Sequence, residues 1–330
     1  MKTRLRWILA GLAALMLPAA LAVSAYAHTV EGSFTRTLKV TGPVELTVTT
    51  GSGNIDVRPG DAASVQVRGL IRVHDNWQLS TEQAERKVRA LESNPPIEQN
   101  GNIIRIGHIT DPELRRLVSI SYELVVPVET RVTSDTGSGD QSIAGVRGPV
   151  RAETGSGNVK VSRVADVVRA ETGSGDIVLD TIKAAVYAET GSGNIQASGI
   201  DGGFVATTGS GDVKLGQTAS GPVKVETGSG NIEASGVQGA LHAQTGSGNI
   251  TVDGKPLGDW KLDTGSGNLT LRLPAQAAFN LYAHTGSGDI STNREITMQG
   301  KIGRHELRGK VGGGGPLVDV GTGSGDIHID

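Results

Sequence analysis

A five-residue segment, Thr-Gly-Ser-Gly followed by Asn or Asp, recurs eleven times in this chain of 330 residues. Its threonines stand at positions 50, 136, 154, 172, 190, 208, 227, 245, 264, 285 and 322. From 136 to 285 the steps are 18, 18, 18, 18, 19, 18, 19 and 21 residues. A short fixed period is typical of solenoids, in which each repeat packs only on its neighbours. The last step, of 37, is about two periods, which predicts one copy without the motif.

Apolar residues alternate with other residues on both sides of the motif. One set stands four residues before the threonine: Leu46, Val132, Val150, Val168, Val186, Phe204, Val223, Leu241, Trp260, Leu281 and Val318. Another stands five residues after it: Ile55, Val159, Ile177, Ile195, Val213, Ile232, Ile250, Leu269, Ile290 and Ile327, with Gln141 as the exception. Such period-two runs are strands with one face inward.

The repeat therefore predicts an all-β fold, a parallel β-solenoid (β-helix) with about 18 residues and two strands per coil. Equivalent strands would stack about 4.8 Å apart, so nine or ten coils would give a rod of roughly 45 Å. Aromatic residues make up only 3% of the chain, which fits a narrow interior of Val, Ile, Leu and Ala. Phe204 and Trp260 occupy slots that hold smaller residues elsewhere, so we expect local widening or end-packing there.

The motif itself is typical of a tight turn, which would form the corner between the two strands of a coil. Glycines on both sides of the serine would allow a tight reversal with positive φ. The threonine would point inward and bond neighbouring coils, and the Asn or Asp would satisfy amides of the turn. The last motif residues would form a structural ladder: Asp140, Asn158, Asp176, Asn194, Asp212, Asn231, Asn249, Asn268 and Asp289. No two aspartates are neighbours in this order, and stacked carboxylates about 5 Å apart would repel by roughly 1 kcal/mol.

Glycine-rich segments of similar composition also bind phosphate or calcium. The motif is not a phosphate-binding Walker loop, because no copy continues into Gly-Lys-Ser/Thr and a strand follows in place of a helix. Glycine-rich turns with Asp bind calcium in parallel β-rolls. A calcium-binding, β-roll-like repeat protein therefore stays an alternative, although six of the eleven copies carry Asn.

Outward positions before the threonine carry charge. One residue before it stand Glu153, Glu171, Glu189 and Glu226, and three residues before it stand Arg151, Arg169 and Lys224. The plainer interpretation is charge pairing on a solvated face, where each pair contributes little stability. The sharper one is a repetitive surface that binds an envelope protein or a cell-wall or surface polymer.

The first 27 residues predict a secretory signal peptide. Three basic residues precede the apolar run from Ile8 to Val23, and Ala25-Tyr26-Ala27 is a typical cleavage site. Removal of this segment leaves 28 basic residues (31 less these three) against 34 acidic ones, a net charge of −6. A surface of this sign disfavours nucleic acid as a partner. We expect export to the periplasm, the cell surface or the medium, with no membrane span after cleavage. The chain has no Cys, and hence neither disulfides nor thiol chemistry.

Residues 28–131 interrupt the regular repeat, which we expect to fill 132–330. Ser80 with Gln83 predicts a helix N-cap and capping box, and Pro95-Pro96 ends that helix. Asn100-Gly101 predicts a hairpin. We expect this insertion to cover the first coils, because a bare end would expose unpaired strand edges. At the opposite end we expect a charged edge formed by residues 326–330.

The segments TLKVTGPVELTVTTGSGNIDV, YELVVPVETRVTSDTGSGD and GGGGPLVDVGTGSGDIHID resemble a bacterial β-strand-repeat family of unknown function labelled "putative adhesin". The helix-bearing insert at 72–116 departs from that pattern. The resemblance implies an exported, β-helical, non-enzymatic protein. We expect no cofactor. We therefore predict a structural or adhesion surface of the cell envelope, with no catalytic or metal site. A polysaccharide-active β-helix enzyme is a further alternative, which would require a cleft with clustered carboxylates.

Overall fold

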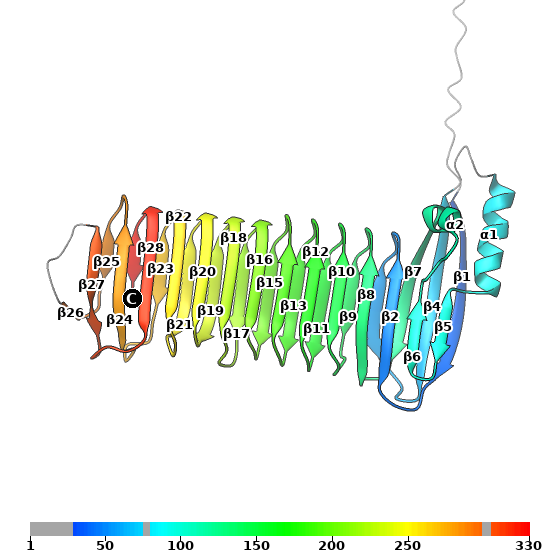
Figure 1. Ribbon diagram of the computed structural model, residues 1–330, viewed down its shortest axis with the longest axis horizontal. Coiled ribbons are helices and arrows are strands. Elements are labelled where there is room, and N and C mark those ends of the chain that lie inside the picture. The colour runs from blue at the N-terminus through cyan, green and yellow to red at the C-terminus, as the bar shows by residue number, and fades with distance from the viewer. Residues whose placement is uncertain (1–28, 75–79, 299–304) are drawn as a thin grey trace, which may run out of the picture.

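The computed structural model describes residues 29–74, 80–298 and 305–330. Two long sheets lie face to face and form a rod (Figure 1). Sheet A has 14 strands and sheet B has 15, and most neighbouring strands are parallel. The predicted β-solenoid with two strands per coil is therefore confirmed. The predicted signal peptide lies outside the described residues.

The regular coils alternate one strand of each sheet. Those of sheet B are β8 (Thr130–Thr136), β10 (Val150–Thr154), β12 (Val168–Thr172), β14 (Val186–Thr190), β16 (Phe204–Ser210), β18 (Val223–Ser229), β20 (Leu241–Ser247) and β22 (Trp260–Ser266). Those of sheet A are β9 (Gln141–Ala144), β11 (Val159–Val164), β13 (Ile177–Ile182), β15 (Ile195–Ile200), β17 (Val213–Gln217), β19 (Ile232–Gln238), β21 (Ile250–Lys255) and β23 (Leu269–Arg272). Equivalent residues pair directly between coils, as Ile177 does with Ile195.

The interior is the single aliphatic core that the alternation predicts. Ile177, Leu179 and Ile195 are fully buried, and the same slots are buried in the other regular coils. Phe204 and Trp260 are also buried, and the indole Nε1 of Trp260 donates to the Gly239 carbonyl at 2.8 Å. Both lie inside the stack, which excludes end-packing, while the local widening stays a prediction. Gln141 is buried too, where it hydrogen-bonds Ser134 and the Glu153 carbonyl.

The N-terminal end continues both sheets with strands of mixed direction. Sheet A adds β3 (Ile55–Pro59), β7 (Val118–Val126), β4 (Ser64–His74) and β1 (Thr29–Lys39), the last two joined antiparallel. Sheet B adds β2 (Val44–Thr50) and the predicted hairpin of β5 (Ile97–Asn100) and β6 (Ile103–Ile106). The insertion thus extends the stack with strands, besides covering it.

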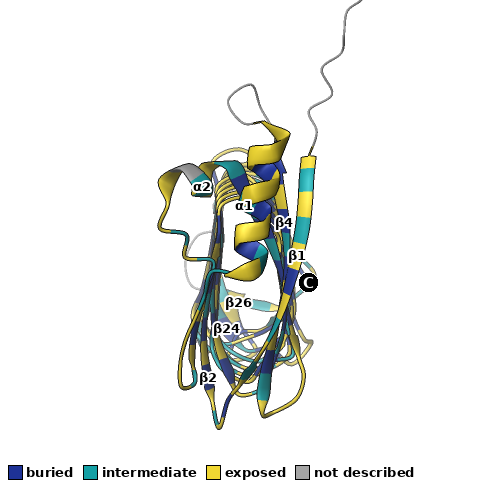
Figure 2. Cartoon of the chain, turned by 90° about the vertical axis from the view of Figure 1, so that its right-hand side faces the viewer, coloured by how far each residue is buried: buried dark blue, intermediate teal, exposed yellow. Residues whose placement is uncertain are grey.

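A helix covers the outermost strands of this end (Figure 2). Helix α1 (Thr81–Ser93) has the predicted capping box at Ser80 and Gln83, and it buries Ala84, Val88 and Leu91. The backbone amide of Ser33 on β1 donates to a Glu92 carboxylate oxygen at 2.9 Å. A short helix, α2 (Pro112–Leu117), precedes β7 and was not predicted. None of the helices in the described ranges has the length and apolarity of a membrane span.

The C-terminal end departs from sequence order. The last copy forms β28 (Leu317–Ser324) and β29 (Ile327–Ile329). These strands lie between the coil of β22 and β23 and the coil of β24 (Phe279–Thr285) and β25 (Ile290–Thr292). Because β29 lies between two other strands, the expected charged edge at 326–330 is wrong. The expected degenerate copy between 285 and 322 is also wrong, because residues 296–298 and 306–311 form an antiparallel pair of strands in place of a coil.

The free edges of the strands explain this order. Strands β26 (Ile296–Met298) and β27 (Glu306–Val311) form an antiparallel pair, and β27 takes the outer edge of β24. The last coil therefore pairs with the inner edge of β24. There Val318, Ile327 and Ile329 are fully buried, whereas Ile290 on the outermost coil stays partly exposed.

Candidate functional site

The repeated corner binds each coil to the one before it. The Thr172 hydroxyl donates to the Gly157 carbonyl of the preceding coil at 2.8 Å and accepts from the Gly175 amide at 3.2 Å. The motif threonines from Thr136 onward make the same bond to the second glycine of a neighbouring coil, for example Thr190 to Gly175 at 2.9 Å, whereas Thr50 donates to the Ile120 carbonyl at 2.8 Å. These hydroxyls are buried and directed inward, so they hold the corner and are not offered to a ligand.

The Asn and Asp side chains form a second ladder along the same corner. The Asp140 carboxylate accepts from the Asn158 amide at 2.8 Å, and the Asn158 side-chain oxygen accepts from the Asp176 amide at 2.9 Å. The bond repeats up the stack through Asn194, Asp212, Asn231, Asn249 and Asn268. Asn and Asp are equivalent in this ladder, because each supplies one side-chain oxygen that accepts a hydrogen bond from a backbone amide of the next coil.

At its last rungs, the spatial order of the ladder residues differs from their order in the sequence. Asp326 stands between Asn268 and Asp289, because its coil is inserted there. The Asp289 amide donates to the Asp326 carboxylate at 2.9 Å. Two aspartates are therefore neighbours at the end of the ladder, and the expected separation of carboxylates fails at this rung.

The glycines of the corner are required mainly by close approach between coils. A Cβ on Gly175 would lie 1.9 Å from the Gly157 carbonyl oxygen, and one on Gly173 would lie 2.3 Å from that of Gly155. Within the motif, and for the described residues, a φ between +142° and +156° occurs only at the second glycine of the last four copies in the chain. The expected reliance on positive φ was therefore wrong for the other copies.

The second corner of the coil does use left-handed backbone. Gly145, Gly199 and Gly236 have φ of 70°, 65° and 69° at equivalent positions. Arg163 and Thr181 take the same position with φ of 53° and 57°. Nearby, hydrogen bonds from Lys183 and from the Thr218 hydroxyl hold the pKa of Asp201 below its ordinary value.

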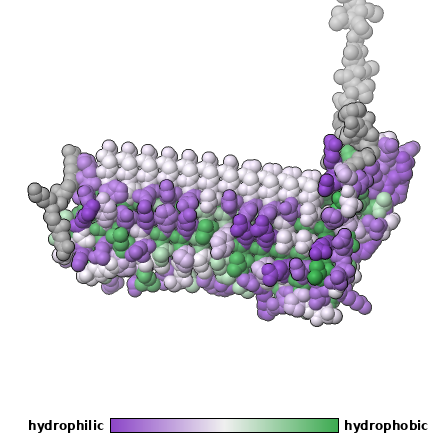
Figure 3. Space-filling model, viewed as in Figure 1, coloured by the Kyte–Doolittle hydropathy of each residue, from purple (hydrophilic) through white to green (hydrophobic). Residues whose placement is uncertain are grey.

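The outer face of sheet B is turned toward the viewer in Figure 3, where the corners form a pale band along one long edge. Glu153, Glu171 and Glu189 stack in register on adjacent strands beside that band, and Asp135 extends the row. The basic residues pair within their own strands, since Arg151 contacts Glu153 and Arg169 contacts Glu171.

Charge pairing on this face is incomplete. Lys224 Nζ lies 3.0 Å from a Glu226 carboxylate oxygen. Tyr187, however, takes the position before Glu189 that arginine holds in the two preceding coils. Within the described ranges, neither Glu189 nor Asp135 lies in an ion pair.

Two grooves run along this face. The first, of about 640 Å³, is lined by the acidic row of Asp135, Glu153, Glu171 and Glu189 and by motif residues of the same coils. The second, of about 550 Å³, is mostly apolar and crosses the coils of β14, β16, β18 and β20. Its lining includes Tyr187, which is 44% exposed, together with Val205 and Pro222.

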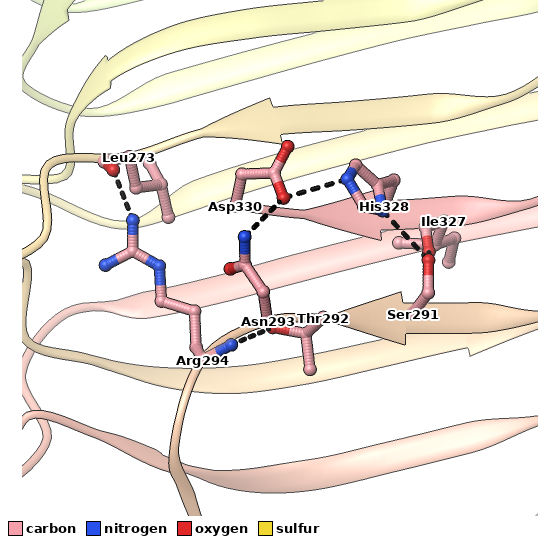
Figure 4. A network of polar contacts seen from close by, with 8 residues as sticks. All are labelled: Leu273, Ser291, Thr292, Asn293, Arg294, Ile327, His328 and Asp330. Atoms are coloured by element: carbon pink, nitrogen blue, oxygen red, sulfur yellow. Dashed lines mark hydrogen bonds and ion pairs between the residues drawn. The ribbon is translucent and has the colours of Figure 1, made fainter.

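A polar network joins the last coils on the outer face of sheet A (Figure 4). Ser291 Oγ lies 2.9 Å from His328 Nδ1, and His328 Nε2 lies 2.8 Å from an Asp330 carboxylate oxygen. Asn293 donates to the same carboxylate at 2.9 Å, and Arg294 donates to the Leu273 carbonyl. Ser291 and His328 come from the adjacent strands β25 and β29, Asp330 directly follows β29, and the contacts hold β25 on β29.

No group of three or more metal-ligating side chains is found within residues 29–74, 80–298 and 305–330. Tyr122 is a buried group that sequence reasoning did not single out. Burial raises the pKa of its phenol, whose oxygen has no hydrogen-bond partner in the described part of the chain. It packs edge-on against Phe34 at 6.5 Å, which places it in the core of the N-terminal end.

Comparison with known proteins finds two solved structures with partial similarity to this chain. A "putative cell adhesion protein" from Clostridium sporogenes ATCC 15579 aligns over 91% of this chain and 99% of its own, with 11% identity and a TM-score of 0.21. A "putative adhesin" from Bacteroides fragilis NCTC 9343 aligns over 74% and 97%, with 15% identity and a TM-score of 0.35. No curated protein matches. Residues 152–330 match Toastrack DUF4097, more than half of the chain. The chain therefore belongs to the Toastrack DUF4097 family.

Proposed function

We propose that this protein is a non-catalytic, exported β-solenoid whose outer face of sheet B is an adhesion or interaction surface of the cell envelope. The observation that carries the proposal is the pair of grooves on that face, one acidic and one apolar. Each groove crosses several coils, so this face suits an extended partner more than a small substrate.

The charges favour a protein partner over a wall polymer. Asp135 and Glu189 line the acidic groove and form no ion pair with any residue of the described ranges. An anionic polymer would be repelled by this row, whereas a basic polypeptide segment would supply the missing counter-charges. Apolar side chains of the same segment would fill the groove at Tyr187 and Val205. The partner we propose is therefore an envelope protein with an extended, basic and apolar segment.

The test compares three purified proteins as bait in an envelope extract. They are the unaltered chain, the variant Glu153→Gln/Glu171→Gln/Glu189→Gln, and a control, Asp180→Asn/Glu233→Gln/Asp253→Asn, that neutralises three carboxylates on sheet A. We expect the unaltered chain and the control to capture one basic protein, and the sheet B variant to lose at least tenfold of it. Equal capture by all three would refute the proposal. Retention by purified wall polymer alone, with no protein captured, would favour the polymer.

Two further measurements address the other functions. If the corner is architectural, EDTA leaves the melting temperature unchanged, because each ladder oxygen already accepts a backbone amide. A sharp fall that calcium reverses would establish a calcium-binding protein. Turnover of a uronate or cell-wall polymer, lost on mutation of clustered carboxylates, would establish an enzyme.

A further inference from the structure

The coil of β28 and β29 is held between two coils that precede it in the chain. On one side Thr322 donates to the Gly267 carbonyl at 2.9 Å, and on the other Thr285 donates to the Gly325 carbonyl at 2.9 Å. These are the bonds that join successive coils elsewhere in the stack. We call the position between these two coils the slot. The slot bonds the motif threonine and the backbone of the inserted coil, and these bonds do not require that this coil belong to the same chain.

A glycine run connects this coil to the strand before it. Gly312, Gly313 and Gly314 have φ of 57°, 92° and 89°, and a Cβ on Gly313 would meet no atom within 4 Å. Glycine changes between such conformations readily, and a few residues of this kind can act as a hinge. Segments joined by a hinge are those that exchange between copies in domain swapping.

The inserted arrangement has a competitor with the same hydrogen-bond pattern. The Thr264 and Thr285 positions both pair with Thr322, so the coil of β24 could close directly on that of β22 in unchanged register. That arrangement would place Asp289 next to Asn268. Insertion instead places Asp289 next to Asp326, where the Asp289 backbone amide donates to the Asp326 carboxylate. Removal of the last coil breaks this bond but also separates two carboxylates on adjacent rungs, which repel each other.

From these features we infer that the segment 317–330 leaves its slot and inserts into the same slot of a second copy. The exchange joins two rods at their C-terminal coils and presents two sheet B faces in one assembly. The contacts of His328 and Asp330 with β25 oppose release, as does the hydrogen bond from the Asp289 amide to Asp326. The neighbouring negative charges of Asp289 and Asp326 favour release.

Cysteine pairs test the exchange cleanly, because the chain has no Cys. Ser266 on β22 and Ser324 on β28 are exposed register partners, at a spacing that a disulfide can bridge. Chains carrying only Ser266→Cys and chains carrying only Ser324→Cys, tagged differently, are mixed under native conditions and oxidised. We expect a covalent heterodimer that grows with incubation. The matched control is Ser229→Cys mixed with Ser247→Cys, register partners within the regular stack, which should give no heterodimer above background.

Further variants give the direction of the effect. Asp326→Asn removes the like-charge rung and should slow heterodimer formation several-fold, whereas Asp212→Asn in the middle of the ladder should not. Hydrogen exchange adds a test without cysteine: the Ile327 amide, which donates to Asp289, should exchange at least tenfold faster than that of Ile232. Heterodimer at the control level, or equal protection of these two amides, would overturn the inference.

Discussion

At the scale of single residues, close approach between coils decides which side chains the corner tolerates. The second glycine of each motif lies against the carbonyl group of the coil before it, as Gly175 does against Gly157. Contact between neighbouring coils therefore explains why the same glycine recurs in every copy of the motif. Each glycine leaves room for the carbonyl group of the equivalent glycine one coil away.

Gly175→Ala should destabilise the fold by about 3 kcal/mol or more, because the new methyl would overlap the Gly157 carbonyl and force the coils apart. Gly216→Ala is the matched control, since its Cβ would meet no atom closer than 3.8 Å. That substitution should change stability by about 0.5 kcal/mol or less. Urea unfolding of both variants measures the difference, and equal losses would contradict the close-approach argument.

Thr181→Gly should stabilise the fold by about 0.5–1 kcal/mol. The threonine has φ of 57° where Gly199 of the next coil has 65°, and a β-branched residue is strained in this region. Thr270→Gly, in the ordinary strand β23, should instead destabilise by a similar amount. A lower melting temperature for Thr181→Gly would show that the backbone there is unstrained.

At the scale of elements, each regular coil carries a threonine where its strand of sheet B enters the corner, and the hydroxyl of this threonine completes the backbone bonding of the corner. Thr172→Val keeps the shape of the side chain but leaves the Gly157 carbonyl and the Gly175 amide without this partner. We expect a loss of about 1–3 kcal/mol. Thr270→Val on the outer face should be nearly neutral, so a similar loss in both variants would contradict the role of the hydroxyl.

The strand-to-strand corner at Asp201 should make stability depend on pH in the acid range. Because Lys183 and Thr218 lower the pKa of Asp201, its contribution is present above the unfolded-state pKa of about 4 and is lost as the pH falls through the lowered value. The difference in melting temperature between the unaltered chain and Asp201→Asn should therefore shrink from pH 7 to pH 2. A constant difference would mean that the carboxylate does not stabilise this corner.

At the scale of the whole molecule, the rod behaves as a sum of coils with nearest-neighbour contacts. Deletion of residues 173–190 removes one complete period and joins Thr172 to Gly191 of the next motif. We expect a folded rod shorter by about 4.8 Å. Deletion of nine residues, 173–181, would end the coil half-way and should unfold the repeat. Circular dichroism and small-angle scattering distinguish the two, and unfolding of both would argue against independent coils.

The N-terminal helix and hairpin were predicted from local signals, because a capping box and a turn dipeptide act within a few residues. Part of the candidate surface also followed from the period, since Glu153 and Glu171 must stack if the coils do. The grooves did not follow, because their shape depends on side chains from several coils. The network of Ser291, His328 and Asp330 was likewise hidden, since it joins copies 37 residues apart.

By itself the sequence determined the length of the coil, its two strands, its inward residues and its register. Each of these features depends on residues close together in the chain, and every copy of the repeat carries the same pattern. Only the tertiary structure decided the order in which the last coils stack. Every copy carries the same hydrogen-bonding groups, so the motif does not specify which two copies stack on each other. That choice depends on which strand edge β27 leaves free, and this competition involves residues far apart in the chain.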